Sequence, residues 1–105
     1  MPDTRPMISN KVYSIDEIQS TIRPIAESYG VERIFLFGSY ARGEATPTSD
    51  IDFRIDKGQV KGFAFGGLIN ALSEALDKDV DVVTTASLDK DFLDYISNEE
   101  VLLYA

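Results

Sequence analysis

The sequence of 105 residues contains no cysteine and no histidine. Without thiols there are no disulfides, no thiolate zinc sites and no cysteine nucleophile. Without imidazole there is neither a Ser-His-Asp triad nor a histidine metal site. Any metal bound by this chain must therefore sit on oxygen ligands, which favours magnesium or manganese.

Basic residues are also scarce, since 10 Lys and Arg stand against 18 Asp and Glu, for a formal net charge of -8. They form no basic run, whereas non-specific affinity for nucleic acid comes from clustered Lys and Arg. We therefore expect no direct nucleic-acid partner. The ordinary interpretation is a soluble acidic protein. The sharper ones are that several acids converge on a divalent cation or that the surface faces a basic partner.

Long apolar segments are absent as well, so we expect no signal peptide, no membrane span and a cytoplasmic location. The length fits one domain, which we place at residues 13–105 after a flexible lead-in at residues 1–12 that carries two prolines. A domain this small leaves much of its surface exposed. A partner protein or self-association as a homo-oligomer would cover part of that surface.

Hydrophobic periodicity predicts the order helix, strand, strand, helix, strand, helix, which is an α/β or α+β domain. Ser14 and Glu17 form a capping box, Gly30 is a stop signal, and Pro24 is expected to kink or divide the first helix. The expected helices cover residues 15–29, 63–76 and 88–96, the last capped by Ser87, and the expected strands cover 31–37, 51–56 and 79–84. Residues 40–43 read as a helical turn and residues 101–104 as an apolar docking tail. The apolar stripe of the middle helix comprises Phe65, Leu68, Ile69, Leu72, Ala75 and Leu76.

Asp50 and Asp52 are two residues apart at the predicted strand 51–56, so both carboxylates project from one face and can share a cation. Two like charges that close repel each other unless a divalent metal neutralises them. Taken alone, the pattern is also typical of the wet face of a half-exposed strand. Upstream, Gly38 and Ser39 end a hydrophobic strand, and glycine lets backbone amides approach phosphate oxygens closely. Taken alone, this pair is an ordinary strand-terminating turn.

The two patterns are more specific together than apart, because a fixed ten residues separate Ser39 from Asp50. Average residue usage gives such a combination odds on the order of one in a thousand in a chain of this size. The stretch GSYARGEATPTSDIDF resembles the signature of the minimal nucleotidyltransferase family, a branch of the DNA polymerase β-like superfamily: Gly-Ser, ten residues, Asp-x-Asp. The likeness runs from the helix before Val31 to the VLLY tail, although only this signature is specific.

The resemblance implies a small mixed sheet of three or more strands flanked by helices and a role for each residue of the signature. Gly38 and Ser39 would hold a nucleoside triphosphate, and Asp50 and Asp52 would bind two Mg²⁺ ions, or Mn²⁺ in their place. Asp81 stands where the family has its third carboxylate, as metal ligand or general base, and Asp79 on the same strand face competes for that position.

Three further residues near the signature have open roles. Arg42 either contacts a phosphate or a partner, or is a solvated loop residue. Tyr40 either stacks on the base or packs. Arg54 stands where relatives usually carry an apolar residue, and either pairs with Asp52 or Asp56 or touches the nucleotide.

The resemblance also implies an activity: transfer of a nucleoside monophosphate, first of all AMP from ATP, to a hydroxyl. Small members of the family resemble the antitoxin of two-gene modules whose toxin is a HEPN-type RNase, and there the acceptor is a tyrosine of the toxin. Two alternatives stay open, an antitoxin that acts by binding alone and a catalytic subunit that modifies a small molecule.

Overall fold

A computed structural model describes residues 11–105, so the predicted lead-in at 1–12 lies almost wholly outside the described residues. The first helix, α1 (Ile15–Tyr29), begins at the predicted capping box. The Glu17 N–H donates to Ser14 Oγ at 3.1 Å, and the Ser14 N–H donates to Glu17 Oε1 at 2.9 Å. The helix ends at Gly30, where a φ of 75° lies in the left-handed region that glycine tolerates.

The expected division of α1 at Pro24 is wrong, because one helix continues through it. Proline removes one backbone hydrogen bond, but burial of the opposite stripe supports the helix on both sides of it. The buried residues of that stripe are Ile18, Ile22 and Ala26.

A four-stranded sheet occupies the centre of the fold, in the order β3-β2-β1-β4. Its strands are β1 (Arg33–Phe37), β2 (Ile51–Asp56), β3 (Val80–Thr84) and β4 (Val101–Tyr104). β1 runs antiparallel to β2 and β4, whereas β2 and β3 are parallel and are joined by the crossover helix α3 (Gly62–Leu76). This mixed sheet with flanking helices confirms the predicted fold class.

The position of the fourth strand was not predicted, since residues 101–104 were expected only to dock as an apolar tail. They pair with β1, with Val101 opposite Leu36 and Leu102 opposite Phe35. Four apolar residues are too few to show the alternation of a strand, and the pairing partner lies far away in the sequence. The tail therefore completes the sheet.

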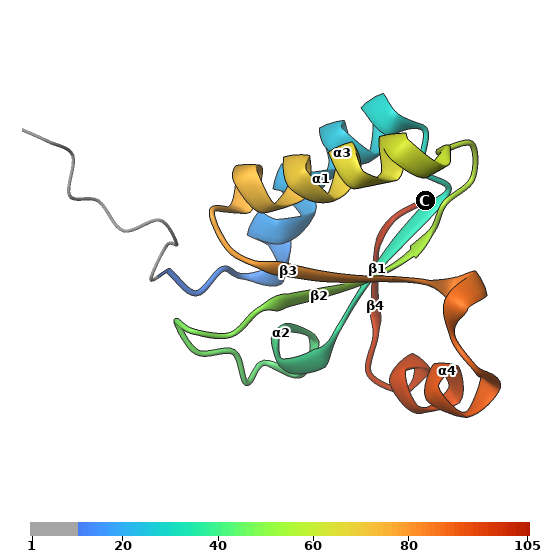
Figure 1. The fold of residues 1–105 in the computed structure, drawn as a ribbon. Coiled ribbons are helices and arrows are strands. Elements are labelled where there is room, and N and C mark those ends of the chain that lie inside the picture. Colours follow the sequence, from blue (N-terminus) through green and yellow to red (C-terminus); the bar gives the residue numbers. More distant parts are fainter. Residues whose placement is uncertain (1–10) are drawn as a thin grey trace, which may run out of the picture.

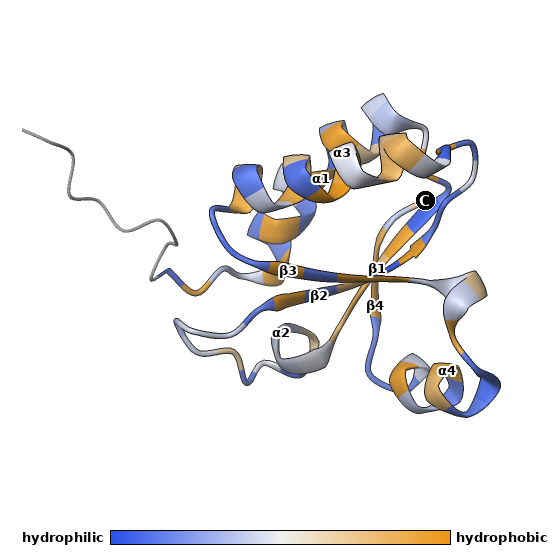
Figure 2. Cartoon of the chain, viewed as in Figure 1, coloured by the Kyte–Doolittle hydropathy of each residue, from blue (hydrophilic) through white to orange (hydrophobic). Residues whose placement is uncertain are grey.

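Helices cover the two faces of the sheet unequally (Figure 1). The long α1 and α3 lie together on one face, and the short α2 (Gly38–Arg42) and α4 (Lys90–Ser97) lie on the other. Alternation along β2 sends Ile51, Phe53 and Ile55 into the core beneath α1 and α3. Asp52 and Arg54 consequently face α2 and α4. Figure 2 shows hydrophobic stretches along the strands, α1 and α3, and hydrophilic ones where α3 meets β3 and where α4 begins.

Two helices differ in detail from the prediction. In α3 the stripe residues Leu68, Leu72 and Leu76 are buried, but Ala75 is exposed. The cap of α4 is Asp89, whose side chain accepts the Phe92 N–H at 2.8 Å, and not Ser87. Ser87 belongs to a short 3-10 turn (Thr85–Ser87) that sequence periodicity does not reveal. Within residues 11–105, no helix combines the length and the apolar character that a membrane crossing needs.

Candidate functional site

Gly38 connects β1 to α2 and lies against the carboxylate of Asp52. The register of the sheet sets Phe37 opposite Asp52, so the next residue of the chain turns directly over that side chain. Gly38 has a φ of 76°, and a Cβ added to it would lie 2.1 Å from Asp52 Oδ2. Only glycine has room for this approach, because a Cβ would overlap the Asp52 carboxylate.

Asp52 is partly buried and has acidic neighbours on both sides. Asp81 is its register partner on the parallel strand β3, and Asp50 stands one residue before β2 begins. Burial, then the charge of Asp81, then that of Asp50 raise the pKa of Asp52 from 3.8 to about 6. The backbone thus places Asp81 opposite Asp52 and Asp50 two residues before Asp52 in the chain.

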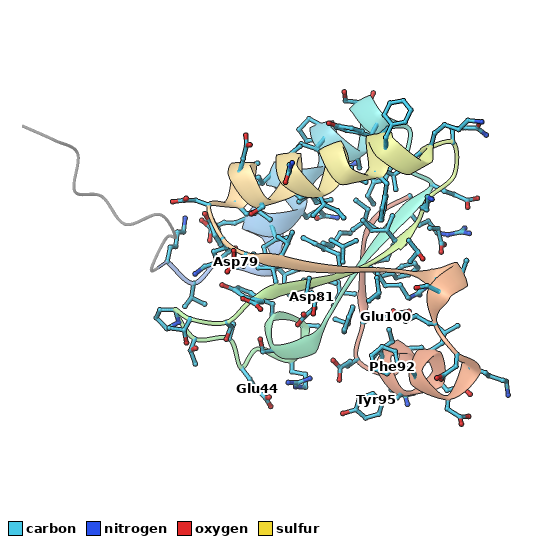
Figure 3. The ribbon with its side chains drawn as sticks, viewed as in Figure 1. Glu44, Asp79, Asp81, Phe92, Tyr95 and Glu100 are labelled. Atoms are coloured by element: carbon cyan, nitrogen blue, oxygen red, sulfur yellow. The ribbon has the colours of Figure 1, made fainter. Side chains whose placement is uncertain are left out.

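The β2–β3 register distinguishes Asp81 from Asp79 by their positions relative to Asp52. Asp81 lies opposite Asp52, whereas Asp79 precedes β3 and uses its carbonyl to accept the Ile51 N–H at 3.2 Å. Figure 3 shows Asp79 where β3 begins and Asp81 farther along the strand. Asp81 is therefore the acid that stands next to Asp52.

The donor chemistry of this group suits a divalent cation, because all its ligands are oxygens and their mutual repulsion would be relieved by positive charge. The side chains are not gathered into a cage, however. Among residues 11–105, no three acidic side chains stand close enough together to hold a metal ion. The register places the ligands, and their side chains would have to turn toward a cation.

Two other residues of the signature lie on α2. The side chain of Ser39 makes no hydrogen bond with the described part of the chain and is partly buried. Tyr40 is 3% exposed and belongs to the hydrophobic core, so it packs and does not stack on a ligand.

Arg42, at the end of α2, is not a free solvated residue. Its Nε donates to Glu44 Oε1 at 2.9 Å and its Nη1 donates to Glu99 Oε2 at 3.0 Å. Glu99 was missed by the sequence reasoning. Its Oε2 also accepts the Gly38 N–H at 2.6 Å. No element and no role was predicted for residues 98–100, and nothing in the sequence signals a contact across 61 positions.

Arg54 does not disturb Asp52. It is 7% exposed, and its main partner is Glu100, at 2.9 Å from Nε and 2.5 Å from Nη2. The predicted pairing with Asp56 is present as a longer contact of 3.8 Å. The guanidinium also lies over the Phe35 ring, 4.0 Å from its centroid. Arg54 is thus a structural residue beside the site.

A cavity of about 440 Å³ lies at the opposite end of β2 and β3 and contains none of the predicted site residues. It is lined by Glu32, Arg33, Ile55, Asp56, Lys57, Thr84, Thr85 and Ala86. The hollow and the signature residues are therefore separate features of the fold.

Known proteins share this arrangement over most of the chain. The family described as "Polymerase beta, Nucleotidyltransferase" matches residues 20–105. "Putative protein adenylyltransferase MJ0435" of Methanocaldococcus jannaschii is 43% identical over 89 residues, which cover 84% of this chain and 96% of that protein. "Protein adenylyltransferase MntA" of Thermococcus cleftensis is 35% identical over 80 residues, covering 71% of this chain and 81% of that protein.

A solved structure described as "Crystal structure of the toxin-antitoxin with AMP-PNP" contains a chain of the same fold. It has a TM-score of 0.70 and 27% identity, and the match covers 83% of this chain and 73% of that one. The matched family region includes the Gly38-Ser39 turn and all three site aspartates. The chain therefore belongs to the polymerase β-type nucleotidyltransferase family, and it resembles the family's protein adenylyltransferases.

Proposed function

We propose that the chain transfers AMP from ATP to a tyrosine hydroxyl of a partner HEPN-type toxin and so acts as its antitoxin. The observation that carries this proposal is the approach of Gly38 to Asp52, with Asp81 beside it in register. A backbone donor suited to phosphate and carboxylates suited to cations meet at one place. A polar strand face without function has no need of that combination.

Each residue has a task in this proposal. The Gly38 N–H, the Ser39 hydroxyl and Arg42 would donate to the triphosphate. Asp50, Asp52 and Asp81 would hold two Mg²⁺ ions, or Mn²⁺. Such ions, when bound, neutralise phosphate charge and favour displacement at phosphorus.

The proposed transfer needs no reactant besides ATP and the acceptor hydroxyl. The acceptor oxygen forms a bond to the α-phosphorus while the bond from that phosphorus to the bridging oxygen breaks, and pyrophosphate leaves. The acceptor proton passes to a carboxylate, for which Asp81 is suited because it is exposed at the edge of the site. The chain's own part is to align the triphosphate and to hold this base.

A protein acceptor is supported by the relatives and by charge. Two relatives carry the name protein adenylyltransferase, and a matching chain comes from a toxin-antitoxin structure with AMP-PNP. The net charge of -8 suits a basic protein surface better than a polynucleotide. The HEPN class of the partner rests on the family resemblance.

The test incubates the purified chain with ATP, Mg²⁺ and a HEPN-type protein encoded beside its gene. The expected result is a gain of one or more AMP units by that protein, located on tyrosine by intact mass and peptide mapping. The reaction without ATP and the reaction with the Asp50→Asn/Asp52→Asn double variant are the controls. An unmodified partner with every nucleoside triphosphate would contradict the proposal.

An antitoxin that acts by binding alone is the second candidate, and the Glu99 contact favours it. The carboxylate of Glu99 already accepts from the Gly38 amide, which the enzyme would need for phosphate. The Asp50→Asn/Asp52→Asn variant separates the two functions. Its rescue of cells that express the toxin would support binding, whereas its failure to rescue, with complex formation intact, would support catalysis.

Gly38→Ala is expected to weaken binding of Mg·ATP roughly 10- to 100-fold, because the new methyl group overlaps the Asp52 carboxylate and displaces it. The matched control is Gly43→Ala. Gly43 has a similar φ of 73° but nothing within 4 Å of an added Cβ. Both variants should lose about 1 kcal/mol of stability from backbone strain. Calorimetric titration with Mg·ATP measures the difference, and equal affinities for the two variants would refute the steric explanation.

A further inference from the structure

Glu99 occupies the donors that the proposed function assigns to phosphate. Its Oε2 accepts the Gly38 N–H at 2.6 Å and the Arg42 Nη1–H at 3.0 Å, and its Oε1 lies 3.2 Å from the same Arg42 nitrogen. The Glu99 side chain is only 18% exposed. An anion supplied by the chain itself therefore sits where a phosphate oxygen would be held.

The backbone on both sides of Glu99 is fixed. Glu99 and Glu100 both donate their N–H groups to the Ile96 carbonyl at 3.0 Å, which closes the turn after α4. Glu100 is held by the buried Arg54, and β4, which starts at Val101, is paired with β1. The turn is thus anchored, and the position of the Glu99 carboxylate follows from the fold.

A carboxylate and a phosphate make the same kind of contact with an N–H donor and with arginine, a short charge-assisted hydrogen bond. One amide hydrogen serves one strong acceptor at a time. Glu99 also adds a fixed negative charge close to Asp52, where an incoming triphosphate would already meet three aspartates. Both effects oppose binding of a second anion while Glu99 stays in place.

We propose that Glu99 is an internal competitor for the triphosphate, and that nucleotide binds only when its side chain leaves the Gly38 amide. This inference rests on the proposed function, because it names what controls access to that same site. The anchored backbone does not have to move. Rotation of one side chain toward solvent frees the amide and Arg42 together, and the fraction of time spent in that rotated state sets the apparent affinity for nucleotide.

The test compares binding of Mg·ATP to the full chain and to Glu99→Gln and Glu99→Ala by calorimetric titration. We expect both variants to bind about tenfold more tightly, the range set by loss of a charge-assisted hydrogen bond. Glu99→Ala is the decisive variant, since a glutamine oxygen still reaches the Gly38 amide. The backbone amide resonance of Gly38 in the nucleotide-free chain should move in both variants.

Glu44→Gln is the matched control, because Glu44 shares Arg42 with Glu99 but does not contact Gly38. It removes the same charge from the same arginine. We expect a change in affinity of less than about threefold, as for an exposed ion pair, and an unmoved Gly38 amide resonance.

The outcomes separate this inference from the proposed function. Nucleotide binding by the unaltered chain with equal or weaker binding by both Glu99 variants would overturn the inference and leave the proposed function standing. Weaker binding in particular would make Glu99 a residue that positions Arg42 for the nucleotide. Absence of Mg·ATP binding in every variant, including Glu99→Ala, would overturn both.

Discussion

Asp52→Asn is expected to lower the rate of AMP transfer on the order of 10³-fold, at the upper end of the loss caused by removing one preorganised electrostatic group. Asp52 is the central acid of the site, since it contacts the Gly38 position and stands in register with Asp81. Asparagine keeps the size of the side chain but cannot neutralise a cation. The measurement is the initial rate of partner modification at saturating Mg·ATP.

The same variant is expected to be more stable than the unaltered chain when no metal is present. The folded pKa of Asp52, about 6, lies above its ordinary value of 3.8, so the ionised carboxylate disfavours the fold above pH 6. A shift of this size corresponds to about 3 kcal/mol at a fully buried group, and solvent screening reduces it here to about 1 kcal/mol. Denaturant unfolding in EDTA should show the gain at pH 8. The gain should vanish as the pH falls toward 3.8, where both states bind the proton.

Asp79→Asn is the control for this pair of effects. It removes the same charge from the residue just before β3 without changing a residue of the proposed machinery, so the transfer rate should stay within about threefold of the unaltered rate. Loss of activity without a gain in stability in Asp52→Asn would mean that burial and the neighbouring carboxylates do not destabilise the ionised Asp52 side chain. An active Asp52→Asn chain would remove Asp52 from the chemistry altogether.

The features of the site that could be predicted from the sequence are those set by local geometry. Two aspartates at spacing two share a strand face in any fold, and a glycine after a hydrophobic strand marks a turn. The β2–β3 register then places Asp81, the third carboxylate that the family resemblance implied, opposite Asp52. The two long-range contacts were not predictable. Glu99 reaches Gly38 and Glu100 reaches Arg54 only because β4 joins the edge of the sheet beside β1, and four residues give no periodic signal for that strand.

Arg54 shows the same limit of prediction from sequence, because its partner lies far away in the chain. The sequence correctly predicted that Arg54 and Asp52 lie on the same face of β2, and Arg54 was therefore expected beside the site. In the structure its guanidinium pairs with Glu100, which lies in a segment for which no role was predicted. The strand face on which a charged residue lies can be predicted from the local sequence. The residue that pairs with it can be identified only from the whole topology.

Arg54→Met is expected to destabilise the fold by about 3 kcal/mol, because it leaves the Glu100 carboxylate buried without a cation. The side chains of Arg54 and Glu100 are 8% and 10% exposed, so water does little to replace the lost partner. Denaturant unfolding at pH 7 measures the loss. Glu44→Gln, which breaks the exposed pair with Arg42, should change stability by less than about 1 kcal/mol.

The double variant Arg54→Met/Glu100→Leu decides whether the ion pair itself stabilises the fold or whether only its disruption is harmful. Replacement of a buried ion pair by apolar side chains is often neutral, so we expect the double variant to lie within about 1 kcal/mol of the unaltered chain. That result would show that this position of β2 accepts an apolar residue without loss of the fold. A double variant as unstable as Arg54→Met would instead show that the pair contributes directly, through the orientation it gives the turn that carries Glu99. In that case the Gly38 amide resonance should move in the double variant, as is expected for Glu99→Ala. The reason is that the Arg54–Glu100 ion pair would then both stabilise the fold and position the Glu99 carboxylate.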